Sequence, residues 1–488
     1  MARTWPRLAV FALALVIAGC AGRVFDAPFR DSQALPETNA PLPAIGEAEP
    51  GANDSVEHRK LLAEYGGRYE DPKVAAMVAG IVGRLSAAAG PTNAPLRLTL
   101  LNSATVNAFA LPDGGLYVTR GLIALANDES ELAAVIAHEI AHVQADHARL
   151  RQRQASAAQL AQRVSEVVND PMIRADSAGQ AVTSLAQFSQ QQELEADEEG
   201  VKLMAAAGFD PFAAARFLRS MERFAALPTL NSVSEEQPGF LSTHPSAPDR
   251  IERATRTARQ FGSPGATRKP SGPFLRSLDG MMFGDDPSEG FVRGREFVHV
   301  DMGIAFTVPD GYTLRNTSAA VLATDGENTA IRFDAARDTA RGDLEAYLKS
   351  GWVRGLIPDS VRVTEEGGKR VATGSALVDG WSFRIGVVQG RALLYRFIFA
   401  SSKAASSYEP AFQSTLASFR ILSPAQKASM RPLRIRTVAV RPNDTIAGLA
   451  TRMRGVTREM QLPLFEALNA VDATNPPIVG QLVKIVTD

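Results

Sequence analysis

The first half of the chain repeats apolar residues at the three- and four-residue spacing of helices. Three long stretches carry this pattern, at residues 71–88, 127–147 and 187–207. In the second stretch Asn127 or Asp128 can cap the first turn, where acidic side chains also suit the helix dipole. The pattern predicts a mainly α domain, which we place at residues 51–262.

A short strand pair interrupts these helical stretches. Residues 96–101 alternate apolar and polar side chains, and residues 106–111 and 116–119 flank the turn sequence Pro-Asp-Gly-Gly. The spacing predicts a small β-hairpin or sheet just ahead of the second long helix.

Beyond residue 290 the pattern changes to short strands. Strand-like runs lie at residues 303–309, 329–333, 361–364, 381–388 and 393–399, with helices at 344–353 and 408–422. Strands with local turns and few helices predict an α+β domain with a mostly antiparallel sheet at residues 291–425. Residues 263–290 are rich in Gly, Pro and Ser and predict a loosely draped connector ahead of it. The chain is therefore expected to be multidomain.

The N-terminus has the pattern of an export signal. Two arginines precede an unbroken apolar run at residues 8–18, which is long enough for a signal-peptide core and short for a membrane span. Small residues then lead to Cys20, as in a bacterial lipobox, in which the cysteine is acylated after cleavage. We predict a lipoprotein signal peptide at residues 1–19, lipidation of Cys20 and a proline-rich tether at residues 20–50. An uncleaved anchor or a plain secretory signal is the alternative.

Composition and charge limit the number of domains and the classes of partner that we expect. With 488 residues, 45% of them hydrophobic and 22% charged, the chain is expected to fold into two to four globular domains. Its net charge of −1 and the lack of a basic block argue against a nucleic-acid partner. Cys20 is the single cysteine, so no disulfide can form within the chain.

The second long helix carries the sequence His138-Glu139-Ile140-Ala141-His142. Its two histidines are four residues apart, so their side chains leave the helix about 40° apart and can share one metal ion. Glu139 can reach a water on that ion and act as the general base of a hydrolytic reaction. Two buried histidines beside a buried glutamate would be costly without a metal, which disfavours a chance pattern.

A catalytic zinc ion usually takes three protein ligands and leaves a position for water, so a third ligand is needed. His147 lies about 140° round the helix from the second motif histidine and is expected to point elsewhere. The third long helix offers Glu193, and Asp197 one turn on is placed to orient a ligand histidine. Glu195 is the alternative ligand. If neither glutamate binds metal, the acidic side chains of this helix simply form a solvated face.

These motifs resemble the HtpX- and BepA-type zinc metallopeptidases, gluzincins related to the CAAX prenyl endopeptidases. N-A-F-A-L-P-D-G-G, H-E-I-A-H and E-L-E-A-D occur in the family's order, and the resemblance covers residues 55–260. It implies one Zn2+ per chain held by His138, His142 and Glu193, with Glu139 as the catalytic base. The predicted lipid anchor makes the chain similar to the periplasmic lipoprotein branch.

A later segment, S-T-H-P followed by D-R-I, is similar to a segment near the active site of that family. By this resemblance His244 or Arg250 could stabilise the oxyanion of a tetrahedral intermediate. His244 could instead bind the zinc as a fourth ligand and hold the enzyme latent. A surface loop that opens the next helix is the plain alternative.

The predicted hairpin is a candidate substrate site. Asn107, Ala108, Phe109 and Ala110 form a strand just ahead of the metal helix, and such a strand can bind an extended peptide by adding it to the sheet. An ordinary core hairpin is the alternative. Protein or peptide substrates are therefore expected.

The last stretch, residues 436–488, has the order strand, helix, helix, strand and resembles a LysM module. In many proteins this small βααβ domain binds N-acetylglucosamine polymers such as peptidoglycan, so the resemblance implies a wall partner. Asn443 stands where the module usually has glycine, and the segment between the two helices is long.

Together these features predict a membrane-tethered periplasmic zinc metalloendopeptidase that acts on damaged or misassembled envelope proteins. Ala21, in place of an aspartate, favours the outer membrane over the inner one as the site of the lipid anchor. The alternative is a non-catalytic assembly factor or a peptidoglycan-binding lipoprotein whose zinc is structural. Glu139 favours the enzyme, because a structural zinc usually closes with four ligands and needs no base beside them.

Overall fold

The computed structural model describes residues 56–90, 96–166, 171–227, 239–244, 248–316, 320–339, 341–402 and 408–488. The chain folds into two compact units, a larger one of residues 55–323 and 418–488 and a smaller one of residues 324–417. The predicted signal peptide, Cys20 and the tether lie outside the described residues.

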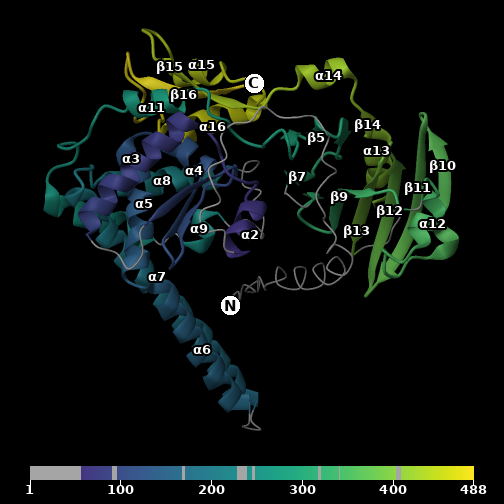
Figure 1. Ribbon diagram of the computed structural model, residues 1–488, viewed down its shortest axis with the longest axis horizontal. Coiled ribbons are helices and arrows are strands. Elements are labelled where there is room, and N and C mark those ends of the chain that lie inside the picture. The colour runs from purple at the N-terminus through teal and green to yellow at the C-terminus, as the bar shows by residue number, and fades with distance from the viewer. Residues whose placement is uncertain are drawn as a thin grey trace, which may run out of the picture. The chain divides into compact units, whose positions relative to one another are not determined.

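Helices make up most of the larger unit, as predicted for its first half (Figure 1). They are α2 (Val56–Glu64), α3 (Pro72–Ala89), α4 (Arg120–Leu125), α5 (Glu129–Gln144), α6 (His147–Glu166), α7 (Pro171–Ala206), α8 (Ala213–Ala225), α9 (Phe240–Thr243), α10 (Pro248–Ala258), α11 (Gly272–Leu278), α14 (Pro424–Ser429), α15 (Ile446–Ala450) and α16 (Arg458–Asn469). Among the described helices, α3 alone is long and apolar enough to cross a membrane. Five of its side chains instead pack into the core of this unit.

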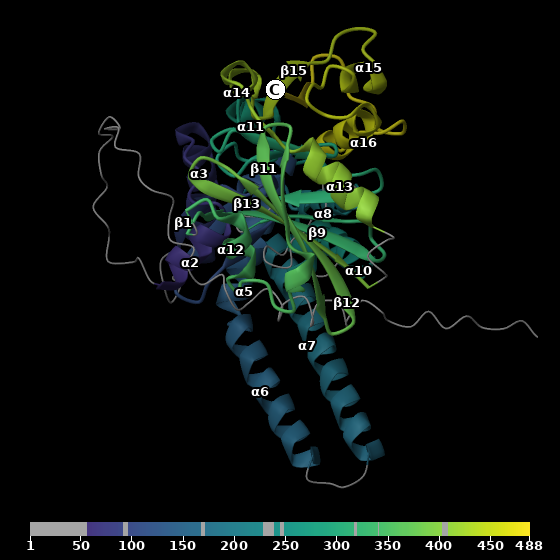
Figure 2. The same ribbon diagram turned by 90° about the vertical axis from the view of Figure 1, so that its right-hand side faces the viewer.

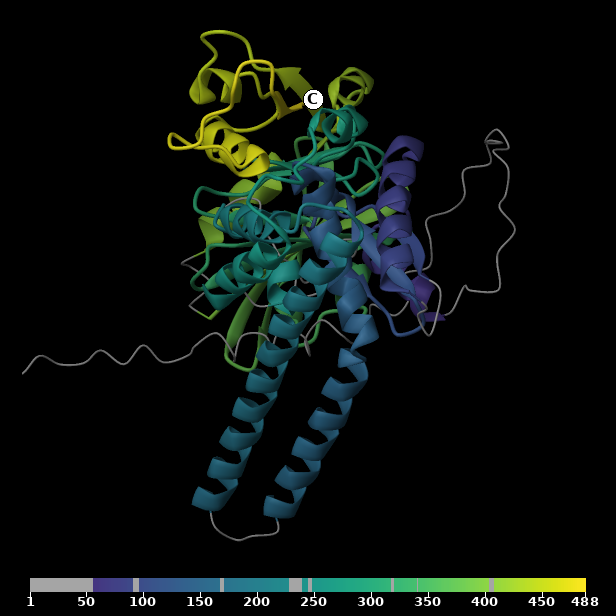
Figure 3. The same cartoon turned by 90° about the vertical axis from the view of Figure 1, so that its left-hand side faces the viewer.

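Two helices of the larger unit form a long antiparallel hairpin. α6 and α7 run side by side and extend well away from the other elements of the unit (Figures 2 and 3). The predicted helix at residues 127–147 is in fact divided between α5 and α6. Asp146, at φ 55°, breaks it, because a left-handed residue cannot continue a right-handed helix.

A three-stranded sheet packs beside α5. Its strands are β1 (Arg97–Leu101), β2 (Ala108–Ala110) and β3 (Gly115–Thr119), in the order β1-β3-β2. β2 and β3 form the predicted hairpin, and β1 runs parallel to β3. β2 is therefore the edge strand, and it is the strand that contacts α5.

A second sheet of the larger unit has the order β14-β6-β5-β4 and is antiparallel. It consists of β4 (Phe291–Arg293), β5 (Glu296–His299), β6 (Ile304–Thr307) and β14 (Arg420–Ile421), and β7 (Thr313–Asn316) and β8 (Val321–Thr324) follow it in the chain. The predicted α+β domain at residues 291–425 is thus divided between the two units, since β4 to β7 and β14 belong to the larger one.

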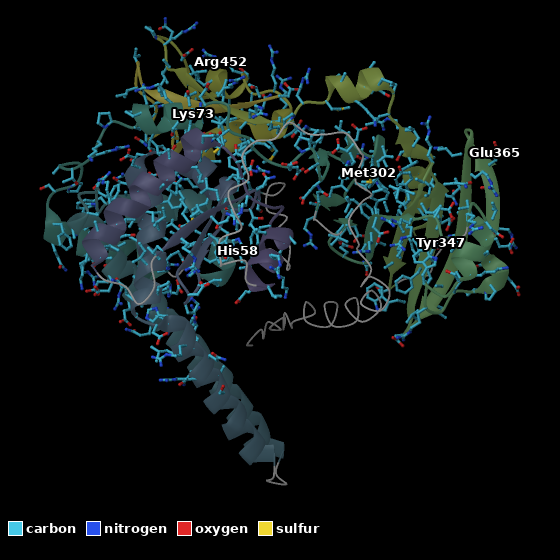
Figure 4. The ribbon with its side chains drawn as sticks, in the orientation of Figure 1. His58, Lys73, Met302, Tyr347, Glu365 and Arg452 are labelled. Carbon is cyan, nitrogen blue, oxygen red and sulfur yellow. The ribbon has the colours of Figure 1, made fainter. Side chains whose placement is uncertain are left out.

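The smaller unit is a twisted antiparallel sheet with two helices, which agrees with the predicted α+β pattern. Its strands are β9 (Thr329–Arg337), β10 (Arg362–Glu366), β11 (Lys369–Val378), β12 (Trp381–Gln389) and β13 (Leu393–Ser401), in the order β10-β11-β12-β13-β9, with α12 (Leu344–Lys349) and α13 (Glu409–Ser418). Tyr347 of α12, labelled in Figure 4, accepts a hydrogen bond of 3.1 Å from Arg396 at the buried face of the sheet.

The C-terminal residues have the predicted order of elements. β15 (Arg434–Ala439) and β16 (Leu482–Thr487) pair antiparallel, with α15 and α16 between them in the chain. Their apolar side chains share one continuous core with α3, α5 and α8, so these elements are packed into the larger unit. The LysM resemblance stays a prediction.

The prediction of a loosely draped connector at residues 263–290 is wrong for its second half. Phe274, Leu275 and Leu278 of α11 are buried in the core of the larger unit. Beyond α11, the Gly280 N–H donates to the carbonyl of Ile435 at 2.8 Å, so the chain is tied to β15. Apolar residues between the glycines and prolines account for this, because they bury their side chains whatever the neighbouring turns do.

Candidate metal centre

Helix α5 carries the predicted motif through the middle of the larger unit. Asp128 caps its start by accepting a hydrogen bond of 2.9 Å from the Glu131 N–H. Every residue from Ser130 to His142 is buried. His138, Glu139 and His142 are therefore held on a rigid, water-excluded helix.

Four side chains from three helical segments converge at one point. They are His138 and His142 from α5, Glu193 from α7 and His244 just after α9, and one ligand atom from each lies within 4.8 Å of all the others. All four side chains are 2–7% exposed. Nε2 of His138 lies 3.0 Å from Nε2 of His142, and Nδ1 of His244 lies 3.0 Å from Oε2 of Glu193.

The approach of α7 to α5 depends on Gly200. A Cβ atom at this position would lie 3.1 Å from the backbone nitrogen of His138 and 3.3 Å from the carbonyl carbon of Ala137. Any larger residue would push the helices apart, so glycine allows the Glu193 carboxylate to reach the two histidines.

Asp197 lies behind His138. Its Oδ1 is 3.0 Å from Nδ1 of His138, on the side of the ring away from the other donors. The guanidinium of Arg250 binds the same carboxylate twice, at 2.6 and 2.7 Å, and also donates to the His244 carbonyl at 3.0 Å. Asp197 thus orients a ring of the centre, and Arg250 holds both Asp197 and the His244 segment in place.

His147 contacts His142, one of the four converging donors. Its Nδ1 lies 2.8 Å from Nδ1 of His142. The expectation that it points elsewhere is wrong, because the helix ends at the left-handed Asp146 and the rotation of a continuous helix does not apply to His147. Glu195, the alternative ligand, lies outside the cluster. Its half-exposed side chain is 3.5 Å from Nε2 of His147.

Glu139 stands beside the four donors without belonging to them. Its Oε2 accepts a hydrogen bond of 3.2 Å from the Ala110 N–H of edge strand β2, and its Oε1 makes no hydrogen bond to the described residues. Nε2 of His244 is 3.6 Å from this Oε1. Burial raises the pKa of the Glu139 carboxyl, with partial opposition from His244 and His138. A raised pKa suits a group that must accept and return a proton near neutral pH.

The predicted substrate residues form the edge of the small sheet. Phe109 pairs with Tyr117 and its ring stacks on that side chain at 5.0 Å between centroids, while Ala108 and Ala110 lie on either side of it in the strand. Asn107 is buried, and its N–H donates to Thr119 Oγ1 at 3.0 Å. The Ala110 N–H points at Glu139, so this edge of the sheet faces the base.

The protonation of the histidines differs across the centre. For His138, burial acts against the charged form, but hydrogen bonds with Asp197 and Glu193 outweigh it and raise its pKa to about 9. For His142, burial prevails and lowers the pKa to about 3. Burial also opposes ionisation of Glu193, yet hydrogen bonds from the three histidines lower its pKa.

Comparison with known proteins identifies the segment that holds these residues. Residues 72–258 match the family described as Peptidase family M48. The segment is an M48 domain. Metallopeptidases of this family use zinc, and the M48 domain brings together His138, His142, Glu193 and His244 in a cluster able to hold a metal ion. Glu139 and Asp197 lie within the same domain.

Relatives of the M48 domain come from bacteria and mitochondria. The beta-barrel assembly-enhancing protease of Escherichia coli (strain K12) is 31% identical over 202 residues, 39% of this chain and 40% of that protein. The protein of the same name in Yersinia pestis is 29% identical over 252 residues, 47% of this chain and 50% of that protein. Mitochondrial metalloendopeptidase OMA1 of Schizosaccharomyces pombe is 31% identical over 210 residues, 40% of this chain and 57% of that protein. The chain thus spans 40–57% of the length of these relatives.

Proposed function

We propose that this protein is a zinc endopeptidase in which His138, His142 and Glu193 hold the ion and Glu139 is the general base. The observation that carries the proposal is the position of Glu139. Its buried carboxylate stands next to four converging metal donors and keeps one oxygen, Oε1, without a hydrogen-bond partner among the described residues. The hydrogen bond from the Ala110 N–H engages only Oε2, so Oε1 is the oxygen that can accept a proton.

The donor set fits zinc. Three imidazole nitrogens and one carboxylate oxygen are the ligand types that Zn2+ takes in proteins. The oxygen-rich coordination that Ca2+ or Mg2+ requires is absent from this cluster. Two of the three ligands are ready for a metal near pH 7, because Glu193 is ionised and His142 is neutral, whereas His138 must lose a proton when the ion binds.

The chemistry divides between the ion and the chain. A zinc ion held here supplies Lewis acidity, which lowers the pKa of a water and polarises a carbonyl. Glu139 Oε1 accepts the proton of the attacking water and later delivers it to the leaving amine. Strand β2 holds the peptide in extended form beside Glu139, and the buried walls of α5 keep bulk water out.

His244 supports a latent resting state. Three protein ligands would leave a position for water on a catalytic zinc, whereas with the His244 ring the cluster offers four donors. Peptide hydrolysis would then require His244 to leave the ion. The alternative of a purely structural zinc would use the same four donors, but it gives no reason for Glu139.

The cellular setting rests on resemblance. We propose that Cys20 carries a lipid that tethers the protein to the periplasmic face of the outer membrane, and that its substrates are damaged or misassembled envelope proteins. Two relatives are named as beta-barrel assembly-enhancing proteases, which supports an envelope role. Peptidoglycan binding by residues 436–488 is the second part of this proposal, and retention of the full chain on purified peptidoglycan tests it.

Proteolysis of casein by residues 51–488 tests the activity, with Glu139→Gln as the matched variant and zinc content measured in both. We expect one zinc per chain in each protein and a rate for Glu139→Gln that is about 10²–10⁴-fold lower. Equal rates would overturn the role of Glu139. If the wild type holds zinc but does not cut, and His244→Ala also fails to cut while it retains zinc, the zinc is structural.

A further inference from the structure

A lysine from the C-terminal strand is completely buried at the start of the zinc helix. Lys484 of β16 has no exposed surface. Its Nζ donates to the carbonyls of Ala124, Leu125 and Ala126, at 2.8, 3.0 and 2.8 Å. An ammonium group has three N–H donors, so each of them has an acceptor.

These carbonyls end helix α4. The last carbonyls of a helix have no partner within it and carry the negative end of its dipole, so a cation is favourable there. Burial lowers the pKa of Lys484 to about 7, with Glu131 and Asp128 acting in the opposite direction. Three carbonyl acceptors within 3.0 Å favour the ammonium form, because a neutral amine could donate to only two of them.

The residues next to these carbonyls begin α5. Asn127 follows Ala126 directly, and its N–H donates to Oε2 of Glu131 at 2.9 Å. Asp128 is the N-cap of α5. Arg216 of α8 lies 3.0 Å from Asp128 and 3.4 Å from Glu131, and it also binds Asp210 at 2.6 Å. Lys484 and Arg216 are thus two of the cations that hold the junction between α4 and the helix of the metal centre.

Lys484 is itself held by α16. Its N–H donates to Asn469 Oδ1 at 2.6 Å, and Asn469 Nδ2 donates to the Lys484 carbonyl at 2.8 Å. Asn469 also donates to the Phe465 carbonyl. Leu468 and Phe465 are fully buried in the core shared with α4, α5 and α8. The C-terminal strand therefore presents its ammonium group at a fixed point.

We propose that Lys484 is a positioning residue for the metal centre and that residues 433–487 are a required part of the peptidase body. The ammonium group fixes the end of α4, and through Asn127 and Asp128 it fixes the register and direction of α5, on which His138 and His142 lie. This proposal rests on the proposed zinc site. A wall-binding module that folds alone would leave the peptidase intact when it is removed, whereas removal of this segment uncovers three carbonyls and the core around α4.

The test compares Lys484→Met with Leu468→Ala in the full chain loaded with zinc. Methionine keeps the length of the side chain and removes the ammonium, whereas Leu468→Ala weakens the same C-terminal elements and keeps it. Two quantities are measured well below the unfolding temperature of each variant: zinc release to a chelator and hydrogen exchange of the amides at residues 126–132. Neither needs peptidase activity, so the result is independent of whether the chain cuts casein.

We expect Lys484→Met to release zinc about 10–100-fold faster and to exchange faster at residues 126–132, with smaller changes of both quantities in Leu468→Ala. Wild-type values in a folded Lys484→Met protein would overturn the proposal, as would equal changes in the two variants. If Lys484→Met does not fold, Asn469→Ala takes its place. This variant frees the strand that carries the ammonium and is expected to change the same two quantities, and wild-type values in it would overturn the proposal.

Discussion

His147 holds His142 through a contact between their Nδ1 atoms at 2.8 Å, so one imidazole orients another at the metal centre. Nε2 of His142 faces His138 at 3.0 Å and Glu193 at 3.4 Å. The two nitrogens of the His142 ring therefore have separate tasks. Carboxylates and carbonyls commonly perform the orienting task for metal-bound histidines, and here Asp197 does so for His138 while His147 does so for His142.

Replacement of His147 by alanine is expected to lower zinc affinity about 10–100-fold, because His142 loses the partner that fixes its tautomer and ring direction. Competition with a chromophoric chelator measures this. His299→Ala is the matched control, since it removes a buried histidine of the larger unit that lies outside the cluster. An unchanged affinity in His147→Ala would show that the contact only fills space.

Asp197 is expected to matter for stability as well as for the metal. In Asp197→Ala the Arg250 guanidinium, 2% exposed, loses both of its hydrogen bonds to Asp197 and keeps the longer contact of 3.6 Å with Glu193. Removing one partner of a buried pair typically costs about 3–5 kcal/mol, because the other charge stays buried. Chemical unfolding of the zinc-free protein measures the loss. Glu198→Ala, which alters only an exposed pair with Lys202, is expected to change stability by less than about 1 kcal/mol. Equal losses of stability in Asp197→Ala and Glu198→Ala would show that the buried Asp197–Arg250 pair contributes no more than an exposed pair.

The main residues of the metal centre can be predicted from the sequence because their arrangement depends on single helices. His138 and His142 are one turn apart on a single helix, and the faces of α7 separate Glu193 and Asp197 from the exposed Glu195. His147 was misplaced because its position depends on a break at Asp146. One left-handed residue decides where the His147 side chain points, and aspartate adopts the left-handed conformation only occasionally, so its presence does not predict the break.

The position of Lys484 depends on long-range packing. The strand–helix–helix–strand order of the C-terminal residues follows from their pattern, but nothing local in Leu-Val-Lys-Ile-Val reveals that Lys484 reaches the end of a helix about 360 residues earlier in the chain. A lysine between apolar residues of a strand suggests an exposed position. Its burial depends on three carbonyls that become available only when α4 ends beside β16.

His244→Ala is expected to increase peptidase activity. The substitution removes the fourth donor, 3.0 Å from Glu193, and leaves a position for water and for the substrate carbonyl. Hydrolysis of a fluorescent peptide at saturating zinc measures this, with Phe240→Leu as a control that keeps the histidine but changes the ring stacked on it at 4.4 Å. A fall of about 10²–10³-fold in kcat would instead identify His244 as an oxyanion-stabilising residue.

Zinc binding is expected to release a proton and to become tighter as the pH rises. The His138 pKa of about 9 in the metal-free protein means that this ring is protonated at pH 7, and a protonated imidazole cannot bind zinc. The stability that this raised pKa gives to the metal-free protein is fully present below pH 6.5 and is lost as the pH rises through 9, which is the range in which zinc meets less competition from the proton.

Calorimetric titration of the metal-free protein at pH 7, in buffers of different ionisation enthalpy, measures the proton count directly. We expect about one proton released per zinc, with apparent affinity rising about tenfold per pH unit between pH 7 and 8 and levelling off above pH 9. Asp197→Asn is the informative variant. It removes one of the two carboxylates that raise the pKa of His138 and leaves Glu193, so the proton release at pH 7 is expected to fall below one. Release of a full proton in Asp197→Asn would assign the protonated ring to a different partner.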